Sequence, residues 1–342
     1  MILKSHVSLV FFIFSFAVPV STLYQQAAEG WVRPAFPRAD TLSRDNQMTG
    51  DTIALADPTI FHHNGEYFLY GTGGDVGKGF LVYTSRDLNK WEGPKGYSAG
   101  YALIEGESFG TDGFWAPQVF HRNGKFFMAY TANEQIAIAE SDHPLGPFKQ
   151  KKLTNIGGNS KKIDPYIYFD QDGRIYLYHV RLQDGNRIFV AQMKEDLSDI
   201  IEGTLKECIK GEKGWENTQS VPWPVAEGPT VIKRNGLYVM MYSANDFRNP
   251  DYAVGVATSK YPTGPWIKIT SNPVLHKRHV QHAGTGHGDL FYDSKGAAHY
   301  VLHTHRTDQV VHPRLTAIVK VRFKGDLPMV DTSSFRYLRI TK

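Results

Sequence analysis

The sequence repeats one short motif five times, and this repeat limits the fold more than any other feature. Each copy consists of an apolar segment, a turn that ends in glycine and a second apolar segment. The copies cover residues 57–74, 116–133, 164–180, 227–245 and 286–305. The turns are Asn-Gly in three copies, Asp-Gly in one and Lys-Gly in one. Asn-Gly and Asp-Gly favour the positive φ angles of tight hairpins, so the repeat predicts five β-hairpins.

A third apolar segment follows each hairpin, so each repeat predicts three to four strands. The first strand carries Pro58, Pro117, Pro165 and Pro229 in four copies, 59, 48 and 64 residues apart. Five such units predict an all-β, five-bladed β-propeller. No segment keeps a long helical period, which excludes a helical solenoid. A β-sandwich of repeated hairpins stays open, although one motif repeated five times disfavours it.

The N-terminus predicts export. Residues 7–20 are apolar apart from two serines and follow Lys4, and at about 14 residues they are shorter than a membrane span. We expect a signal peptide over 1–22 and one catalytic propeller domain over 23–342, located in the periplasm or secreted. Cys208 is the single cysteine, so no disulfide forms within the chain. Because no cysteine directly follows the apolar segment, we expect no lipoprotein.

Composition excludes several classes of protein. Hydrophobic residues make up 41% of the chain, aromatic residues 13% and charged residues 21%, which excludes a disordered chain, a coiled coil and a multi-span membrane protein. The net charge of +4 gives no basic stripe for phosphate, so we expect no nucleic-acid partner. We also expect no membrane contact after cleavage of the signal peptide. The sequence leaves the oligomeric state open.

Three acids stand at the same phase of the repeat. Asp57 and Asp164 directly precede the motif proline, and Glu227 precedes it by two positions. In a propeller the first strand of each blade lies innermost, so these side chains should meet around the axis. An Asp before Pro often begins a turn, but the flanking segments here are apolar strands. Grouped carboxyls push one another's pKa values apart, which glycoside hydrolysis needs.

The motifs together resemble glycoside hydrolase family 43. The matching pieces are Ala56-Asp57-Pro58, Trp115-Ala116-Pro117, Ile163-Asp164-Pro165, Glu227-Gly228-Pro229 and Gly286-His287-Gly288, with the third-strand signature at residues 141–148 and again at 259–266. Each piece is weak by itself, but all five occur in the right order at propeller spacing. The resemblance covers about residues 57–322.

The resemblance implies a five-bladed propeller and an inverting glycosidase. It implies that Asp57 is the general base, Glu227 the general acid and Asp164 the acid that orients Glu227 and raises its pKa. In an inverting enzyme the base and acid stand roughly 6.5–9.5 Å apart, with water between. The implied substrates are α-L-arabinofuranosyl or β-D-xylosyl bonds of plant polysaccharides or oligosaccharides. An exo-acting arabinofuranosidase is the first choice and a β-xylosidase the second.

The resemblance also suggests residues that contact substrate. Arg314 matches an arginine that reaches the sugar at the bottom of the pocket, and Trp115 and Phe114 border the cavity. Alternatively, Arg314 lies on the surface at the start of a strand, and Trp115 and Phe114 pack between blades. His287 matches a position near the axis that in some relatives lies beside calcium. A lone histidine would hold calcium through water, so we expect no required cofactor and leave calcium open.

Four other functions stay open. An endo-arabinanase or a galactan-active glycosidase would share the fold, and loops at the pocket mouth would decide between them. A non-catalytic carbohydrate-binding propeller would need no acids in phase. A fructan hydrolase would carry an Asn-Asp-Pro-Asn-Gly-like start, but residues 55–59 read Leu-Ala-Asp-Pro-Thr. The irregular segment with Trp215 and Trp223, just before Glu227, is long enough to wall a subsite.

Overall fold

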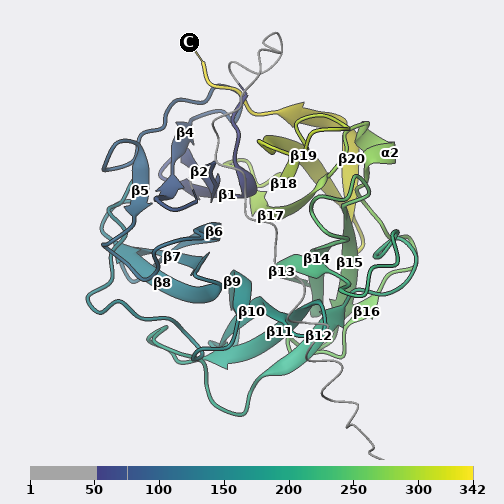
Figure 1. Ribbon diagram of the computed structural model, residues 1–342, viewed down its shortest axis with the longest axis horizontal. Coiled ribbons are helices and arrows are strands. Elements are labelled where there is room, and N and C mark those ends of the chain that lie inside the picture. Colours follow the sequence, from purple (N-terminus) through teal and green to yellow (C-terminus); the bar gives the residue numbers. More distant parts are fainter. Residues whose placement is uncertain (1–51, 75, 342) are drawn as a thin grey trace, which may run out of the picture. The chain divides into compact units, whose positions relative to one another are not determined.

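The computed structural model describes residues 52–74 and 76–341. The expected signal peptide and the lead-in over 23–51 lie outside the described residues. The described chain is almost entirely β-structure, and its blades form a ring around a central axis (Figure 1). This confirms the five-bladed β-propeller. In the described part of the chain, no helix has the length and apolarity needed to span a membrane.

The first two blades each have three strands in their main sheet. Blade one contains β1 (Ala56–His63), β2 (Glu66–Thr72) and β4 (Tyr83–Ser85), while β3 (Gly79–Leu81) pairs with β5 (Tyr101–Ile104) in a separate small sheet. Blade two contains β6 (Trp115–Arg122), β7 (Lys125–Ala132) and β8 (Gln135–Ser141).

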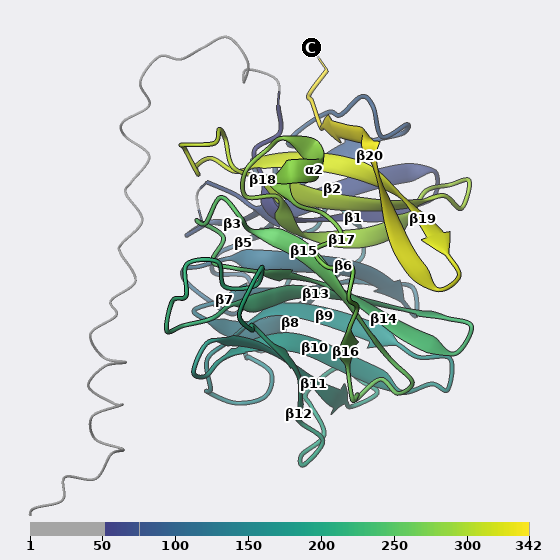
Figure 2. The ribbon, with the colours of Figure 1, turned by 90° about the vertical axis from the view of Figure 1, so that its right-hand side faces the viewer.

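The last three blades each have four antiparallel strands. Blade three contains β9 (Lys162–Phe169), β10 (Ile175–Leu182), β11 (Asn186–Met193) and β12 (Lys206–Lys210). Blade four contains β13 (Ala226–Arg234), β14 (Leu237–Ala244), β15 (Ala253–Ser259) and β16 (Ile267–Lys268). The short helix α2 (Lys277–Val280) follows. Blade five contains β17 (Gly286–Tyr292), β18 (Ala298–Thr304), β19 (Leu315–Lys324) and β20 (Leu327–Tyr337). The last two form a long hairpin, yellow in Figure 2.

The predicted hairpins are present, with turns of two lengths. At Asn64-Gly65, Asn123-Gly124 and Asn235-Gly236 both turn residues have positive φ, and the strands pair directly on either side. These are two-residue turns of the kind that Asn-Gly favours. The Asp-Gly and Lys-Gly turns lie in longer loops, because the flanking pairs are Phe169 with Ile175 and Tyr292 with Ala298.

The hydrophobic core is divided among the gaps between blades. Five clusters of buried apolar side chains are present in the described residues, one between each pair of neighbouring blades. Aromatic residues are prominent in them: Tyr70, Phe80 and Tyr130 are fully buried between blades one and two. The high aromatic content therefore serves mainly to pack sheet against sheet.

Both ends of the described chain close the ring. The backbone of Ile53 bonds to Leu338 and Thr316 of blade five, and residues 339–341 run along Trp91 of blade one. Trp91 and Leu338 are buried in the cluster between blades one and five. Closure joins β1 to β17, so the five innermost strands β1, β6, β9, β13 and β17 contact one another around the axis.

Candidate active site

Each innermost strand contains one extra residue near its start. In all five ladders, two residues of the inner strand stand opposite one residue of the next strand, as Asp57 and Pro58 stand opposite Gly71. The residues in the bulges with positive φ are Asp57, Ala116, Asp164, Gly228 and His287. A bulge redirects the side chains beside it. The same bulge therefore brings Asp57, Asp164 and His287 to the central axis.

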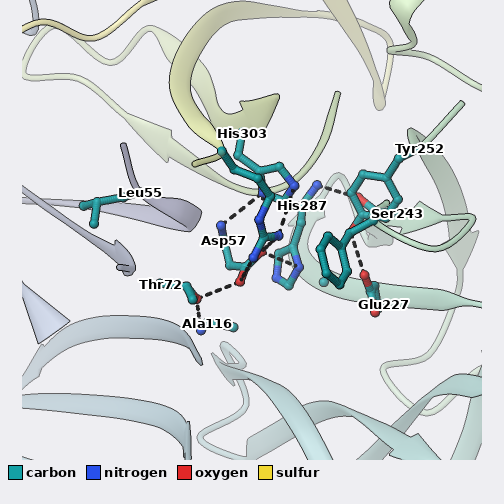
Figure 3. Close-up of polar contacts among 12 residues, drawn as sticks. Leu55, Asp57, Thr72, Ala116, Glu227, Ser243, Tyr252, His287 and His303 are labelled. Carbon is teal, nitrogen blue, oxygen red and sulfur yellow. Dashed lines mark hydrogen bonds and ion pairs between the residues drawn. The ribbon is translucent and has the colours of Figure 1, made fainter. Parts of the chain in front are cut away.

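The N–H of each bulge residue bonds to a side chain of the preceding blade. Thr72 accepts from Ala116 (3.0 Å), Thr131 from Asp164 (2.9 Å) and Ser243 from His287 (2.8 Å). The ring is completed by Nδ1 of His303, 3.1 Å from the backbone nitrogen of Asp57. Thr72, Thr131, Ser243 and His303 occupy the same register, directly opposite the residue before the bulge. Figure 3 shows the bonds of Thr72 and Ser243.

Blade three breaks this pattern, and the break explains where Asp164 lies. The register position is occupied there by Val180, which has no polar side-chain atom. The N–H of Gly228 bonds instead to Oδ2 of Asp164, at 3.2 Å. Since Gly228 directly follows Glu227, the carboxylate of Asp164 holds the backbone that carries Glu227.

Asp57 is buried among positive and hydrogen-bonding groups. Nη1 of Arg314 lies 2.9 Å from its Oδ1, and the hydroxyl of Thr72 donates to its Oδ2 at 2.7 Å. Nδ1 of His287 lies 3.3 Å from Oδ1 and Nδ1 of His303 3.4 Å. Burial works to raise the pKa of Asp57, but Arg314, the two histidines and Thr72 together hold that pKa well below its usual value. Asp57 is therefore ionised at neutral pH.

Glu227 is buried with neutral partners. Tyr252 donates its hydroxyl to Oε1 and Asn186 donates its amide to Oε2, both at 2.8 Å. Burial raises the pKa of Glu227 to about 7, and the carboxylates of Asp246 and Asp57 add to this, while the two hydrogen bonds oppose it. Glu227 therefore holds a proton at mildly acidic pH. In Figure 3 it lies on the far side of His287 from Asp57.

His287 lies between the two aspartates. Its Nδ1 is 3.3 Å from Asp57 and 3.9 Å from Oδ2 of Asp164. Its ring packs against Gly228, where a Cβ would lie only 2.7 Å from the imidazole. Burial lowers the pKa of His287 although Asp57 opposes the shift, so the ring is neutral at pH 7.

The other expected substrate contacts divide into two groups. Arg314 reaches the axis, where it pairs with Asp57 and stacks over Phe247, 4.6 Å from the ring centroid. Trp115 begins β6, is half-buried and packs against the cluster between blades three and four. Phe114 is 0% exposed and stacks on Tyr130. A ring without exposed surface has no face for a sugar, so we leave Phe114 out of the proposed site.

A small cavity lies on the axis beside these residues. Asp57, Asp164 and His287 line it together with residues farther along the inner strands, including Thr59 and Asp289. Asp289 accepts hydrogen bonds from the hydroxyls of Thr59 (2.7 Å) and Thr230 (2.9 Å). Within 52–74 and 76–341, no three His, Cys, Asp or Glu side chains are grouped to hold a metal ion.

Sequence reasoning missed three residues of this site as partners of the acids. Tyr252 and Asn186 contact Glu227 but lie outside the repeated motif, and His303 contacts Asp57 from the second strand of the fifth copy. Only His303 left a signal, because it occupies the register position of Thr72, Thr131 and Ser243. Asn186 begins β11 and Tyr252 just precedes β15, so both lie at the strand ends that face the site.

This arrangement supplies an ionised carboxylate and a protonated carboxyl in one buried site. The first can take a proton from water and the second can give one to a leaving oxygen, which is the pairing that acid–base hydrolysis requires.

Comparisons with known proteins agree with this chemistry. The family model described as glycosyl hydrolases family 43 matches residues 52–328. A solved structure described as an endo-1,4-β-xylanase from Bacteroides thetaiotaomicron VPI-5482 is 40% identical, has a TM-score of 0.79 and covers 85% of this chain and 98% of that one.

Two curated proteins show more distant similarity. β-D-galactofuranosidase xynD of Aspergillus niger is 26% identical over 78% of this chain and 79% of that protein. Extracellular endo-α-(1→5)-L-arabinanase 2 of Bacillus subtilis is 25% identical over 72% of this chain. The match spans only 55% of the length of that arabinanase.

The opposite pKa shifts predict opposite effects of neutral substitutions on stability. Glu227 has a raised pKa in the folded state. Its contribution to the free energy of unfolding is therefore fully present below pH 4.5, and it is lost as the pH rises through about 7, where the buried carboxyl must ionise. At about 1.4 kcal/mol per pKa unit, Glu227→Gln should stabilise the protein by about 3 kcal/mol at pH 8 and have little effect at pH 4. Tyr252 can turn its hydroxyl to accept from the new amide.

Asp57→Asn is the matched substitution. The pKa of Asp57 is lowered in the folded state, so its contribution is present above pH 3.8 and is lost as the pH falls below that value. Asp57→Asn should therefore destabilise the protein at pH 8. Chemical denaturation at pH 4, 6 and 8 measures both effects. Equal changes in unfolding free energy for the two variants at pH 8 would contradict the assigned charge states.

Proposed function

Because the chain belongs to glycosyl hydrolase family 43, we propose that it is an inverting glycosidase in which Asp57 is the general base and Glu227 the general acid. Family membership supports hydrolysis of arabinan, xylan or galactofuranose substrates. The observation that carries the assignment of roles is the contrast between the two carboxyls. Asp57 is buried beside a cation and hydrogen-bond donors, whereas Glu227 is buried with neutral donors and with two carboxylates nearby.

In this mechanism, hydrolysis takes place in one displacement. Asp57 accepts a proton from a water molecule as the water oxygen attacks the anomeric carbon. Glu227 gives its proton to the glycosidic oxygen as the bond to the leaving group breaks. Arg314 and Thr72 fix the orientation of Asp57, and the Asp57 carboxylate next to them remains ionised between turnovers. Glu227 then regains a proton from solvent, which its raised pKa favours.

Asp164 acts as a positioning residue in this proposal. Its Oδ2 accepts the N–H of Gly228, the residue after Glu227, so it fixes the strand that presents the acid. This fits the expected role of orienting the acid. Asp246 and Asp57 are the charged groups that most raise the pKa of Glu227. We therefore propose that Asp164 acts mainly by fixing the position of Glu227.

We propose a pentosyl unit as the sugar that is released, either α-L-arabinofuranosyl or β-D-xylosyl. The name of the 40% identical structure, an endo-1,4-β-xylanase, supports xylan-type substrates and keeps xylosyl bonds beside the first choice of arabinofuranosyl bonds. Trp115 and the remaining N–H groups of Arg314 are the proposed sugar contacts, since both residues retain partial exposure near the axis.

Export remains part of the proposal, and it rests on the apolar segment over residues 7–20. We expect the protein recovered from outside the cytoplasm to begin near residue 23. N-terminal sequencing of that protein measures this, and an intact residue 1 would contradict cleavage.

Substitution of the two carboxyls tests the roles. With aryl α-L-arabinofuranosides, β-D-xylopyranosides and β-D-galactofuranosides, and the matching oligosaccharides, Glu227→Gln should lower kcat/KM by about 10²–10⁴ on oligosaccharides. Its effect should be smaller on nitrophenyl glycosides, whose leaving group needs little protonation. Asp57→Asn should impair both, because water must be activated in either case.

Asp170→Asn is the control. Asp170 is a buried carboxyl that follows β9 at the end away from the site, and it bonds to Lys233 and Tyr238. This variant should keep rates within a few-fold. Full activity of both Asp57→Asn and Glu227→Gln would refute the roles, and a wild-type protein that only binds these sugars would indicate a carbohydrate-binding propeller.

We leave a calcium ion near His287 open and propose that the reaction does not require one. The cavity is lined by hydroxyl, amide and carboxylate oxygens of Thr59, Gln118 and Asp289, the donor type that calcium prefers. Such an ion would order water beside His287. We expect EDTA treatment to leave kcat unchanged, because Asp57 and Glu227 supply the base and the acid. A loss of rate restored by calcium and not by magnesium would contradict this.

A further inference from the structure

We propose that Trp223 couples recognition of the leaving-group sugar to the position of the general acid: its exposed ring packs against that sugar while its indole N–H, through Asn186, holds the carboxyl of Glu227. This inference rests on the proposed function and assigns the subsite beyond the scissile bond to the loop over residues 211–225.

A continuous chain of hydrogen bonds joins Trp223 to Glu227. Nε1 of Trp223 donates to Oδ1 of Asn186 at 2.9 Å, and Nδ2 of Asn186 donates to Oε2 of Glu227 at 2.8 Å. An indole nitrogen can only donate, so it must face the carbonyl oxygen of Asn186. The amide nitrogen of Asn186 is thereby directed at Glu227. The hydrogen bond from Trp223 therefore fixes the orientation of the Asn186 side-chain amide, with its nitrogen toward Glu227.

The loop that carries Trp223 is docked against the same residue. The N–H of Asn186 donates to the carbonyl of Pro224 at 2.9 Å, and Asn186 forms a β-bridge with Val225. Gly185 permits this approach, since a Cβ there would lie 2.5 Å from the oxygen of Pro224. Pro222 and Pro224 flank Trp223 and restrict its backbone. Movement of the ring is therefore transmitted to Asn186.

The rest of the loop is anchored to blade four. Buried Glu216 accepts hydrogen bonds from Tyr242 and from Lys268, both at 2.5 Å. Trp215 packs over Gly255, where a Cβ would lie 2.7 Å from its ring. Trp215 is thus a structural residue of the loop. Trp223 differs, because 37% of it is exposed while Asn186 and Glu227 behind it are buried.

The position of Trp223 in the site indicates that it contacts the leaving-group sugar. A general acid gives its proton to the leaving oxygen, so groups bonded to Glu227 on the side away from Asp57 lie next to the leaving group. The hydrogen bonds of Trp223 lead through Asn186 to Glu227, whereas Asp57 is held by other side chains, Arg314 and Thr72. An indole face can pack on the apolar C–H face of a sugar ring.

Kinetics with two substrates test the inference. Trp223→Phe keeps a ring and removes the N–H, and Trp223→Ala removes both. We expect Trp223→Phe to lower kcat on an oligosaccharide at least tenfold and on the nitrophenyl glycoside by less than threefold. Trp223→Ala should also raise KM for the oligosaccharide only. Tyr261→Ala, which removes an exposed aromatic residue of blade four, should change neither.

A spectroscopic measurement tests the coupling without activity. The indole ¹⁵N–H resonance of Trp223, assigned by its absence in Trp223→Phe, should shift with pH with a midpoint near that of Glu227 and stay fixed in Glu227→Gln. A resonance that does not titrate, or equal rate losses on both substrates with Trp223→Phe, would overturn the inference. Failure of the proposed function would appear differently, as a wild-type protein that hydrolyses neither substrate.

Discussion

The structure depends on one constraint that is repeated in every blade. The bulge in each inner strand leaves one backbone N–H without a partner in its own β-ladder. A buried N–H needs a partner, and here the partner comes from the preceding blade each time. Thr72, Thr131, Ser243 and His303 provide it in four blades and Asp164 in the fifth. The bulges therefore direct side chains to the axis and also link the blades. Fold and site share the same hydrogen bonds, and Asp164 and His303 belong to both.

The chemistry follows from an uneven distribution of charge around the axis. Arg314 and two neutral histidines surround Asp57, whereas the side chains that donate hydrogen bonds to Glu227 are the neutral Tyr252 and Asn186. Two carboxyls of similar intrinsic acidity thereby acquire opposite protonation states at neutral pH. Their backbones are related by the repeat, so what distinguishes them is what the neighbouring strands and loops contribute.

The repeat predicted the fold and the three acids because both depend on local patterns. Asn-Gly turns, the motif proline and the phase of Asp57, Asp164 and Glu227 can all be read within single motifs. The partners of the acids could not be predicted in this way. Asn186 meets Glu227 only after blades three and four pack together, and Tyr252 reaches Glu227 from the loop before β15 of the same blade. Phe114 shows the same limit, since its neighbour Trp115 retains exposure and a sequence does not reveal which of two adjacent aromatic side chains is buried.

The central claim is that Asp57 acts on water while Glu227 acts on the leaving oxygen, in a single displacement. Proton NMR of the first-formed sugar, recorded before the released sugar equilibrates between anomers, tests it most directly. A single displacement predicts that this sugar has the anomeric configuration opposite to that of the bond that was cleaved. A first-formed sugar with the configuration retained would mean that a carboxylate attacks the sugar itself, and it would contradict the roles of Asp57 and Glu227.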